Sequence, residues 1–166
     1  EPIKVNTPSS VSEVKVPENS VLNILVGPDG KIFLGTDNKN DMVAMLQTVT
    51  DKFGVTINAR QLKNFKEESM VGVPVSIMAD YLNLESEKMA EEIQKHGIPT
   101  DSIDGGMSEF QEWVKAARES NPDIKIAIKC DSKTSYKVVK TMMSELQDMN
   151  ENRYQLITNL KTSAED

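Results

Sequence analysis

The 166-residue sequence has few of the residues that build most catalytic and metal centres. It has one cysteine, one histidine and one tryptophan, and aromatic residues make up only 5%. A single cysteine excludes a scaffold stapled by internal disulfides. A single histidine, without further His or Cys at metal-ligand spacing, excludes the usual zinc sites, and we expect no cofactor. No apolar run approaches the roughly 20 residues that a membrane-spanning helix needs.

Positive charge is also scarce. Lys and Arg total 19 against 26 Asp and Glu, which gives a net charge of −7. Readers of duplex nucleic acid need a basic surface to neutralise phosphates, so we expect no nucleic-acid partner. The length suits one domain with a tail. The chain begins at Glu1 rather than Met, which we interpret as a processed protein or an excised part of a longer one, from which a signal peptide or membrane anchor could have been removed.

The two ends of the chain differ from its middle in composition. Residues 1–20 are rich in Ser, Asn, Glu and Pro, which predicts an extended linker with strand-like alternation at Val14 and Val16. A disordered tail is the alternative. We expect the folded domain to span residues 21–161 and a polar tail to cover residues 162–166.

Residues 21–54 predict a hairpin followed by a helix. The apolar stretches 21–26 and 31–34 flank the turn sequence Gly27-Pro28-Asp29-Gly30. The same glycines lack the spacing of a phosphate-binding loop, so we reject that interpretation. A helical apolar period then runs from Met42 to Phe53, with Asp37, Asn38 or Asn40 as its cap and Gly54 as its stop.

Residues 55–107 predict three short helices, at 60–68, 75–82 and 86–96, between loops rich in Gly and Pro. About 50 residues are marginal for independent folding, so we expect this segment to lie beside the core as a helical insertion.

The last third predicts a helix, a strand, a helix and a strand. Ser108 caps a helix that runs to Glu119, residues 124–130 alternate as a half-buried strand, and Thr134 or Ser135 caps the next helix. Residues 154–160 alternate as the final strand. The fold class is therefore α+β: a two-layer sandwich on a small mixed sheet, built from the N-terminal hairpin and a βαβ unit with parallel strands, covered by helices.

No residue cluster favours catalysis. His96 stands at an expected helix end, where the dipole favours a cation. Cys130 follows the lysine-bearing strand, which we expect to place it on the lysine side or, with a bulge, at the core edge, as a packing residue. The acidic pairs are typical of solvated helix faces, and the spacing of Asp101 and Asp104 lacks the full ligand set of a calcium loop. The acidic pairs are Glu67-Glu68, Glu91-Glu92 and Glu109 with Glu112. We predict no enzyme.

Because no residue cluster favours catalysis, the sequence favours a binding or assembly module over an enzyme. The final strand, next to the C-terminal tail, is expected at a sheet edge that is open to pairing with another chain. The nine methionines lie mostly in helical stripes, where core filling is favoured over an adaptable interface.

Residues 124–139 read IKIAIKCDSKTSYKVV. This block resembles a motif of the ExbD/TolR family, in which a basic-ended strand precedes Ala-Asp, polar residues, a Tyr and a helix with Val-Val. Asp131 and Tyr136 match its Asp and Tyr, as structural motif residues, while Cys130 replaces the Ala. The Asp-Gly hairpin and Val14-Lys15-Val16-Pro17 resemble the family's opening strands and its membrane-proximal linker. Residues 55–107 interrupt the family pattern and are similar to insertions of Bacteroidota members.

The resemblance implies a periplasmic domain anchored in the inner membrane by one helix, whose proton-carrying Asp is not in this chain. It implies a homodimer, an ExbB-like channel protein and a TonB-like partner, and the use of the proton motive force for outer-membrane transport. The rival is a TolR-like module that binds peptidoglycan, for which we expect a concave site between residues 55–107 and the sheet. The residues expected to bind the partner or the second copy are Val14, Val16, Pro17, Tyr154, Leu156, Thr158 and Leu160.

Overall fold

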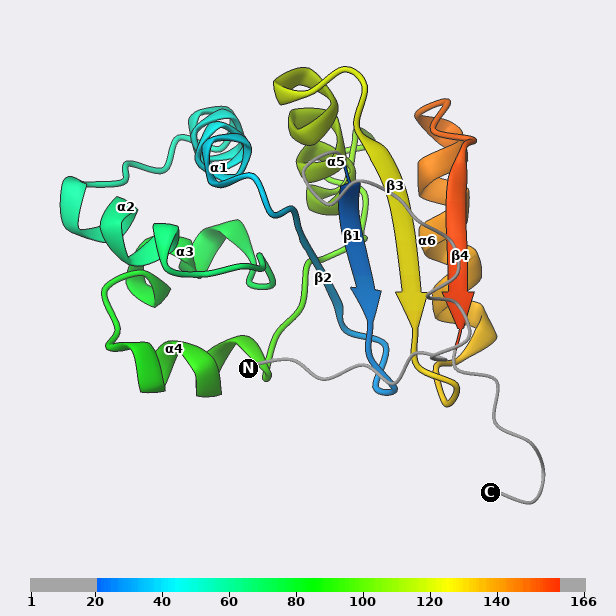
Figure 1. The fold of residues 1–166 in the computed structure, drawn as a ribbon, viewed down its shortest axis with the longest axis horizontal. Helices are drawn as coiled ribbons and strands as arrows, with labels where there is room; N and C mark the ends of the chain where they lie inside the picture. Colours follow the sequence, from blue (N-terminus) through cyan, green and yellow to red (C-terminus); the bar gives the residue numbers. More distant parts are fainter. Residues whose placement is uncertain (1–20, 159–166) are drawn as a thin grey trace.

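The structure is a computed structural model that describes residues 21–158. It is an α+β fold in which helices pack on a four-stranded mixed sheet, as the sequence predicts (Figure 1). The elements are β1 (Val21–Val26), β2 (Ile32–Gly35), α1 (Lys39–Lys52), α2 (Ala59–Lys66), α3 (Val75–Tyr81), α4 (Ser86–Ile93), α5 (Glu109–Ser120), β3 (Lys125–Cys130), α6 (Tyr136–Asp148) and β4 (Tyr154–Thr158).

The predicted hairpin is confirmed. β1 and β2 are antiparallel, and the turn between them closes with a 2.9 Å hydrogen bond from the Gly30 N–H to the Gly27 carbonyl. Pro28 presets its own φ, and Gly30 adopts a φ of 84°, which is costly for any residue with a Cβ.

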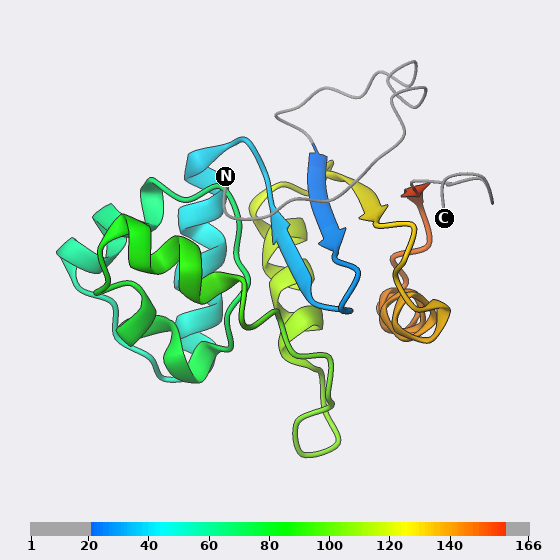
Figure 2. The same cartoon turned by 90° about the horizontal axis from the view of Figure 1, so that it is seen from below.

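The sheet order is β2-β1-β3-β4, with β3 parallel to both β1 and β4. The parallel pairing of the two strands that flank α6 is therefore confirmed. Figure 2 shows α5 and α6 on the same face of this sheet. The core residues of that face alternate along each strand and are almost fully buried: Leu22, Ile24, Val26, Ile126, Ile128 and Cys130.

The expected position of Cys130 is wrong. Cys130 aligns with Val26 in a regular register and is 1% exposed, inside the core. Residues two apart on a strand share a face, so Cys130 lies on the side of Ile126 and Ile128, and Lys129 lies on the other.

The helix ends follow the local signals at most places. The Asn38 Oδ1 accepts a hydrogen bond from the Asp41 N–H at 3.0 Å, and Gly54, with φ of 70°, follows α1. α4 ends at Ile93, three residues before the predicted end at His96. The reason is tertiary, because the Gly97 N–H donates to the Gly72 carbonyl at 2.6 Å and draws the chain away from the helix axis.

Residues 55–107 form α2, α3 and α4 on the β2 side of the sheet (Figure 1). Leu34 of β2 exchanges two backbone hydrogen bonds with Val71, at 3.0 and 2.7 Å. Further along β2, the Ile32 carbonyl accepts from the Ile98 N–H at 2.8 Å. The outer edge of β2 is thus occupied by this segment.

Candidate functional site

The residues predicted for binding and the two structural motif residues fall into three groups. Tyr154, Leu156 and Thr158 lie on β4, and Asp131 and Tyr136 lie on either side of the link from β3 to α6. The others lie outside the described residues: Val14, Val16, Pro17 and Leu160.

β4 is the outer strand of the sheet. It pairs with β3 over five residue positions, from Ile126 with Tyr154 to Cys130 with Thr158. Within residues 21–158 no strand pairs with its other side. Leu156, at the middle of β4, is 43% exposed. An edge of this kind offers unpaired backbone N–H and C=O groups to an incoming strand.

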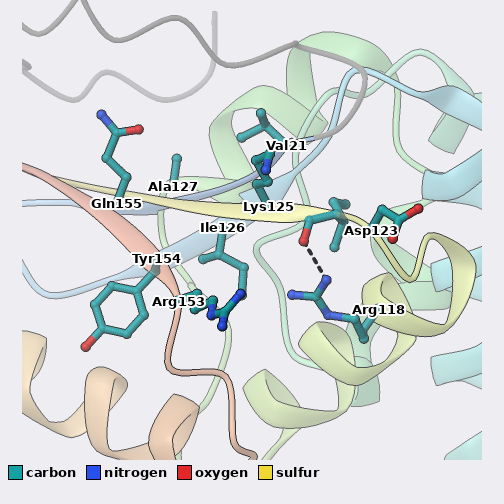
Figure 3. Close-up of a pocket in the computed structure, with 10 residues that line it drawn as sticks. Val21, Arg118, Asp123, Lys125, Ile126, Ala127, Arg153, Tyr154 and Gln155 are labelled. Carbon is teal, nitrogen blue, oxygen red and sulfur yellow. Dashed lines mark hydrogen bonds between the residues drawn. The ribbon is translucent and has the colours of Figure 1, made fainter.

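A pocket of about 380 Å³ lies where β3 and β4 begin (Figure 3). Its residues come from the starts of β1, β3 and β4 and from the end of α5. The residues that line it are Val21, Arg118, Asp123, Ile124, Lys125, Ile126, Ala127, Arg153, Tyr154 and Gln155. Three of these side chains are cationic and one is a carboxylate, so the charge of the lining is positive on an acidic chain.

Arg118 is held by four acceptors. Its Nε and Nη2 donate to the two carboxylate oxygens of Glu151 at 3.0 and 2.8 Å. Its Nη1 donates to the carbonyls of Pro122 and Ile124 at 2.9 and 2.6 Å. This bidentate geometry is the strong form of an arginine–carboxylate pair. Arg118 therefore joins α5 to the loops before β3 and β4, and it lines the pocket.

Asp131 closes the turn after β3. Its backbone N–H donates to the Val26 carbonyl at 3.1 Å, and its Oδ1 accepts from the Lys133 N–H at 3.0 Å. Thr134 extends the link, since its Oγ1 donates to the Gly27 carbonyl at 3.0 Å. Asp131 is 7% exposed, whereas Tyr136 is 77% exposed at the start of α6. The two motif residues thus differ, because Asp131 joins β3 to the hairpin and the Tyr136 ring faces solvent.

Cys130 and His96, the cysteine and histidine considered for catalysis, have surroundings that do not favour it. Burial raises the pKa of the Cys130 thiol to about 11, whereas a nucleophilic cysteine needs a lowered pKa. The Nε2 of His96 lies 3.6 Å from a Glu92 carboxylate oxygen on the preceding turn. Among residues 21–158, no three His, Cys, Asp or Glu side chains gather into a group that could hold a metal ion.

Glu109 has a role that the sequence analysis missed. Its Oε1 accepts a 2.7 Å hydrogen bond from the Val75 N–H, at the start of α3. Burial raises the pKa of this carboxyl, and the hydrogen bond opposes that shift. Glu112, considered as its acidic partner, instead has a carboxylate oxygen 4.0 Å from the Nζ of Lys52. Val75 is 34 residues away from Glu109, so no local pattern could have revealed the contact.

A second, larger groove of about 540 Å³ lies between the end of the helical insertion and the sheet. His96 to Asp101 form one wall, the turn residues Asp29 to Ile32 form another, and Lys137, Val138 and Thr141 of α6 form the third. Its charged side chains carry both signs, and the Lys31 Nζ donates to Asp29 Oδ2 at 2.7 Å. This groove lies where a concave site between residues 55–107 and the sheet is expected, and its use as a binding site stays a prediction.

None of the described helices combines the length and apolar character needed to cross a bilayer. The family model described as biopolymer transport protein ExbD/TolR matches residues 1–161. No curated protein and no solved structure matches the chain. Proteins of the matched family are transport-associated and work in complexes with other transport-system proteins. Because the match covers nearly the whole sequence, the chain belongs to the ExbD/TolR family.

Proposed function

We propose that this chain is the periplasmic domain of an ExbD-like subunit in a complex driven by the proton motive force. With an ExbB-like channel protein at the inner membrane and a TonB-like protein, it powers transport across the outer membrane. The domain acts as a homodimer and by pairing a partner strand with β4. The observation that supports this mode is that residues 55–107 occupy the outer edge of β2, whereas no strand of residues 21–158 pairs with the outer edge of β4.

Strand addition suits a transducer that must engage and release its partner. Main-chain hydrogen bonds along β4 supply affinity, and the pocket at its start supplies selectivity. Anchoring at one membrane raises the effective concentration of both proteins, so a weak contact is sufficient. Val14, Val16 and Pro17 are proposed as the linker that switches between bound and free states.

An NMR titration tests this function. The labelled domain is titrated with the periplasmic C-terminal region of a cognate TonB-type protein. We expect shifts in β4 and in residues 11–17, and none along β2. Shifts confined to residues 55–107, or no shifts at all, would contradict the proposal.

Substitution at the edge separates binding from folding. Leu156→Pro should abolish pairing at β4, because a proline removes a backbone donor. Leu156→Lys is the milder variant, because this side chain is 43% exposed and a lysine can be accommodated without disturbing the fold. It should still weaken partner binding, because charged residues at a sheet edge discourage strand pairing. Ile103→Lys is the matched control, because Ile103 is 39% exposed in a loop away from the sheet. Retained partner binding in both Leu156 variants would remove β4 from the interface.

Peptidoglycan binding, as in a TolR-like module of an envelope-integrity system, is the second candidate. It is favoured by the 540 Å³ groove, whose lysines and carboxylates could meet the charged groups of a cell-wall stem peptide. In a titration with peptidoglycan fragments, this function predicts shifts at His96 to Asp101 and at Lys137. Shifts there, with none in β4 on adding the TonB-type protein, would make the groove the working surface.

A further inference from the structure

We infer that the strand that pairs with β4 is acidic at one end, and that Lys125 and Arg153 receive its carboxylate. This inference rests on the proposed function and adds the chemistry of the partner. The site is the 380 Å³ pocket at the start of β4, which any strand lying along that edge must pass at Arg153.

Lys125 and Arg153 are the available cations of the pocket. Both are exposed, and neither forms an ion pair with a carboxylate among the described residues. Arg118 differs, because Glu151 and two carbonyls already occupy its guanidinium. Two cations with free donors therefore flank a pocket whose third cation is structural.

The pocket contains little to neutralise these two charges. Asp123 is the one carboxylate among the described residues that line it. Figure 3 shows the Asp123 side chain turned away from Arg153. Tyr154 and Ile126 add apolar surface beside the cations, which lowers the local dielectric and strengthens a pair formed there. Among the described residues, an incoming carboxylate would thus meet the exposed donors of Arg153 and Lys125, with Asp123 as the one competing carboxylate of the lining.

A second copy of the chain fits this site poorly. Residues 153–161 read RYQLITNLK, with a cation at each end and no carboxylate. In parallel pairing the second copy would bring its own Arg153 to the pocket, and in antiparallel pairing it would bring Lys161. Like charges across paired strands are destabilising, so charge favours an acidic partner strand over self-pairing.

Synthetic peptides of about ten residues test the inference. Three peptides share one alternating Val-Thr strand sequence and carry two Glu, two Gln or two Lys residues at one end. Each is titrated into the 15N-labelled domain at low and at high salt. We expect the Glu peptide to shift β4 resonances and to bind about fivefold more tightly than the Gln peptide. The difference in affinity between the Glu and Lys peptides should be larger still. Both differences should shrink at high salt.

Charge reversal in the protein completes the test. Arg153→Glu and Lys125→Glu should each reduce the preference for the Glu peptide, and the double variant should prefer the Lys peptide. Lys133→Glu is the matched control, because Lys133 is exposed at the opposite end of β3. It should leave the preference unchanged.

The failures of the two proposals are distinguishable. If all three peptides bind β4 equally, the charge inference is overturned and pairing at β4 stands. If the preference persists in the double variant, the carboxylate is received elsewhere, which also overturns it. If no peptide shifts β4, both the inference and the proposed use of this edge fail.

Discussion

The two outer strands of the sheet have different surroundings. β2 exchanges two backbone hydrogen bonds with Val71 and accepts one from the Ile98 N–H, whereas no described strand lies beyond β4. Both strands are short, and neither carries a charged residue within its bounds. Unpaired edges invite pairing with other chains, so a protein that leaves one open and covers the other directs its partner to one side. Among the described residues, the segment 55–107 thus leaves β4 as the edge that we propose for the partner strand.

The largest effect is expected from disrupting the covered edge. Gly72→Ala would place a Cβ 2.1 Å from Cδ1 of the Phe33 ring and 3.0 Å from Cγ1 of Ile93. Relief requires a shift of the insertion away from β2, and we expect a loss of about 3 kcal/mol of unfolding free energy. Urea denaturation measures it. Gly106→Ala, in an exposed loop, is the control and should change stability by less than about 0.5 kcal/mol. Equal stability of both variants would contradict the close packing of this edge.

A smaller effect is expected at the contact between α5 and the insertion. Glu109→Ala removes the acceptor for the Val75 N–H and should cost about 1 kcal/mol. Glu112→Ala removes only a 4.0 Å ion pair with Lys52 and should cost less than about 0.5 kcal/mol. Thermal unfolding of the two variants compares them. A larger loss for Glu112→Ala would show that Glu109 does not hold α3.

The pH dependence of stability should reflect the half-buried carboxyls. Burial is the largest cause of the raised pKa of Glu145. It outweighs the hydrogen bond that Ser108 Oγ donates to this carboxyl, which lowers the pKa. A raised pKa means that the folded state binds protons that the unfolded state has released, so stability falls as pH rises from about 4.5 through the folded pKa. Glu145→Gln should flatten this slope in denaturation measured across that range. Glu119→Gln, exposed on α5, should leave it unchanged, and an equal slope in all three proteins would refute the assignment.

The smallest expected signal is the reactivity of Cys130. Burial raises the pKa of its thiol to about 11, so few of these thiols are ionised near pH 8, and the side chain is almost fully buried. The native protein should react with a thiol reagent only as fast as it opens, and urea should make the reaction rapid. Fast native reaction would place Cys130 outside the core and reopen a catalytic role.

Local signals explain which elements the sequence predicts well. The Pro-Asp turn and Gly30 encode the hairpin within four residues, and Ser108 with Gln111 forms a capping box, with hydrogen bonds of 3.2 and 2.9 Å, that starts α5 where predicted. The predicted strand 154–160 is confirmed from Tyr154 to Thr158, while its last two residues lie outside the described part.

Long-range contacts explain what the sequence could not reveal. The cover of β2 depends on Val71 and Ile98, which lie far from it in sequence, and the α4 end depends on Gly72. The pocket at β4 joins residues from 21 to 155, so Lys125 and Arg153, which form no ion pair with another described residue, appear together only in the fold. The misplacement of Cys130 was a different error, since the strand period already assigned it to the side of Ile126 and Ile128.

Amide hydrogen exchange of the domain, alone and with the TonB-type partner region, tests the central claim most directly. The account predicts slow exchange at Leu34 of β2 in both states, because its N–H is bonded to Val71. It predicts that alternate amides of Tyr154–Thr158 exchange fast in the free protein and slowly in the complex. Protection that appears along β2, or β4 amides that stay fast when the partner is bound, would contradict it.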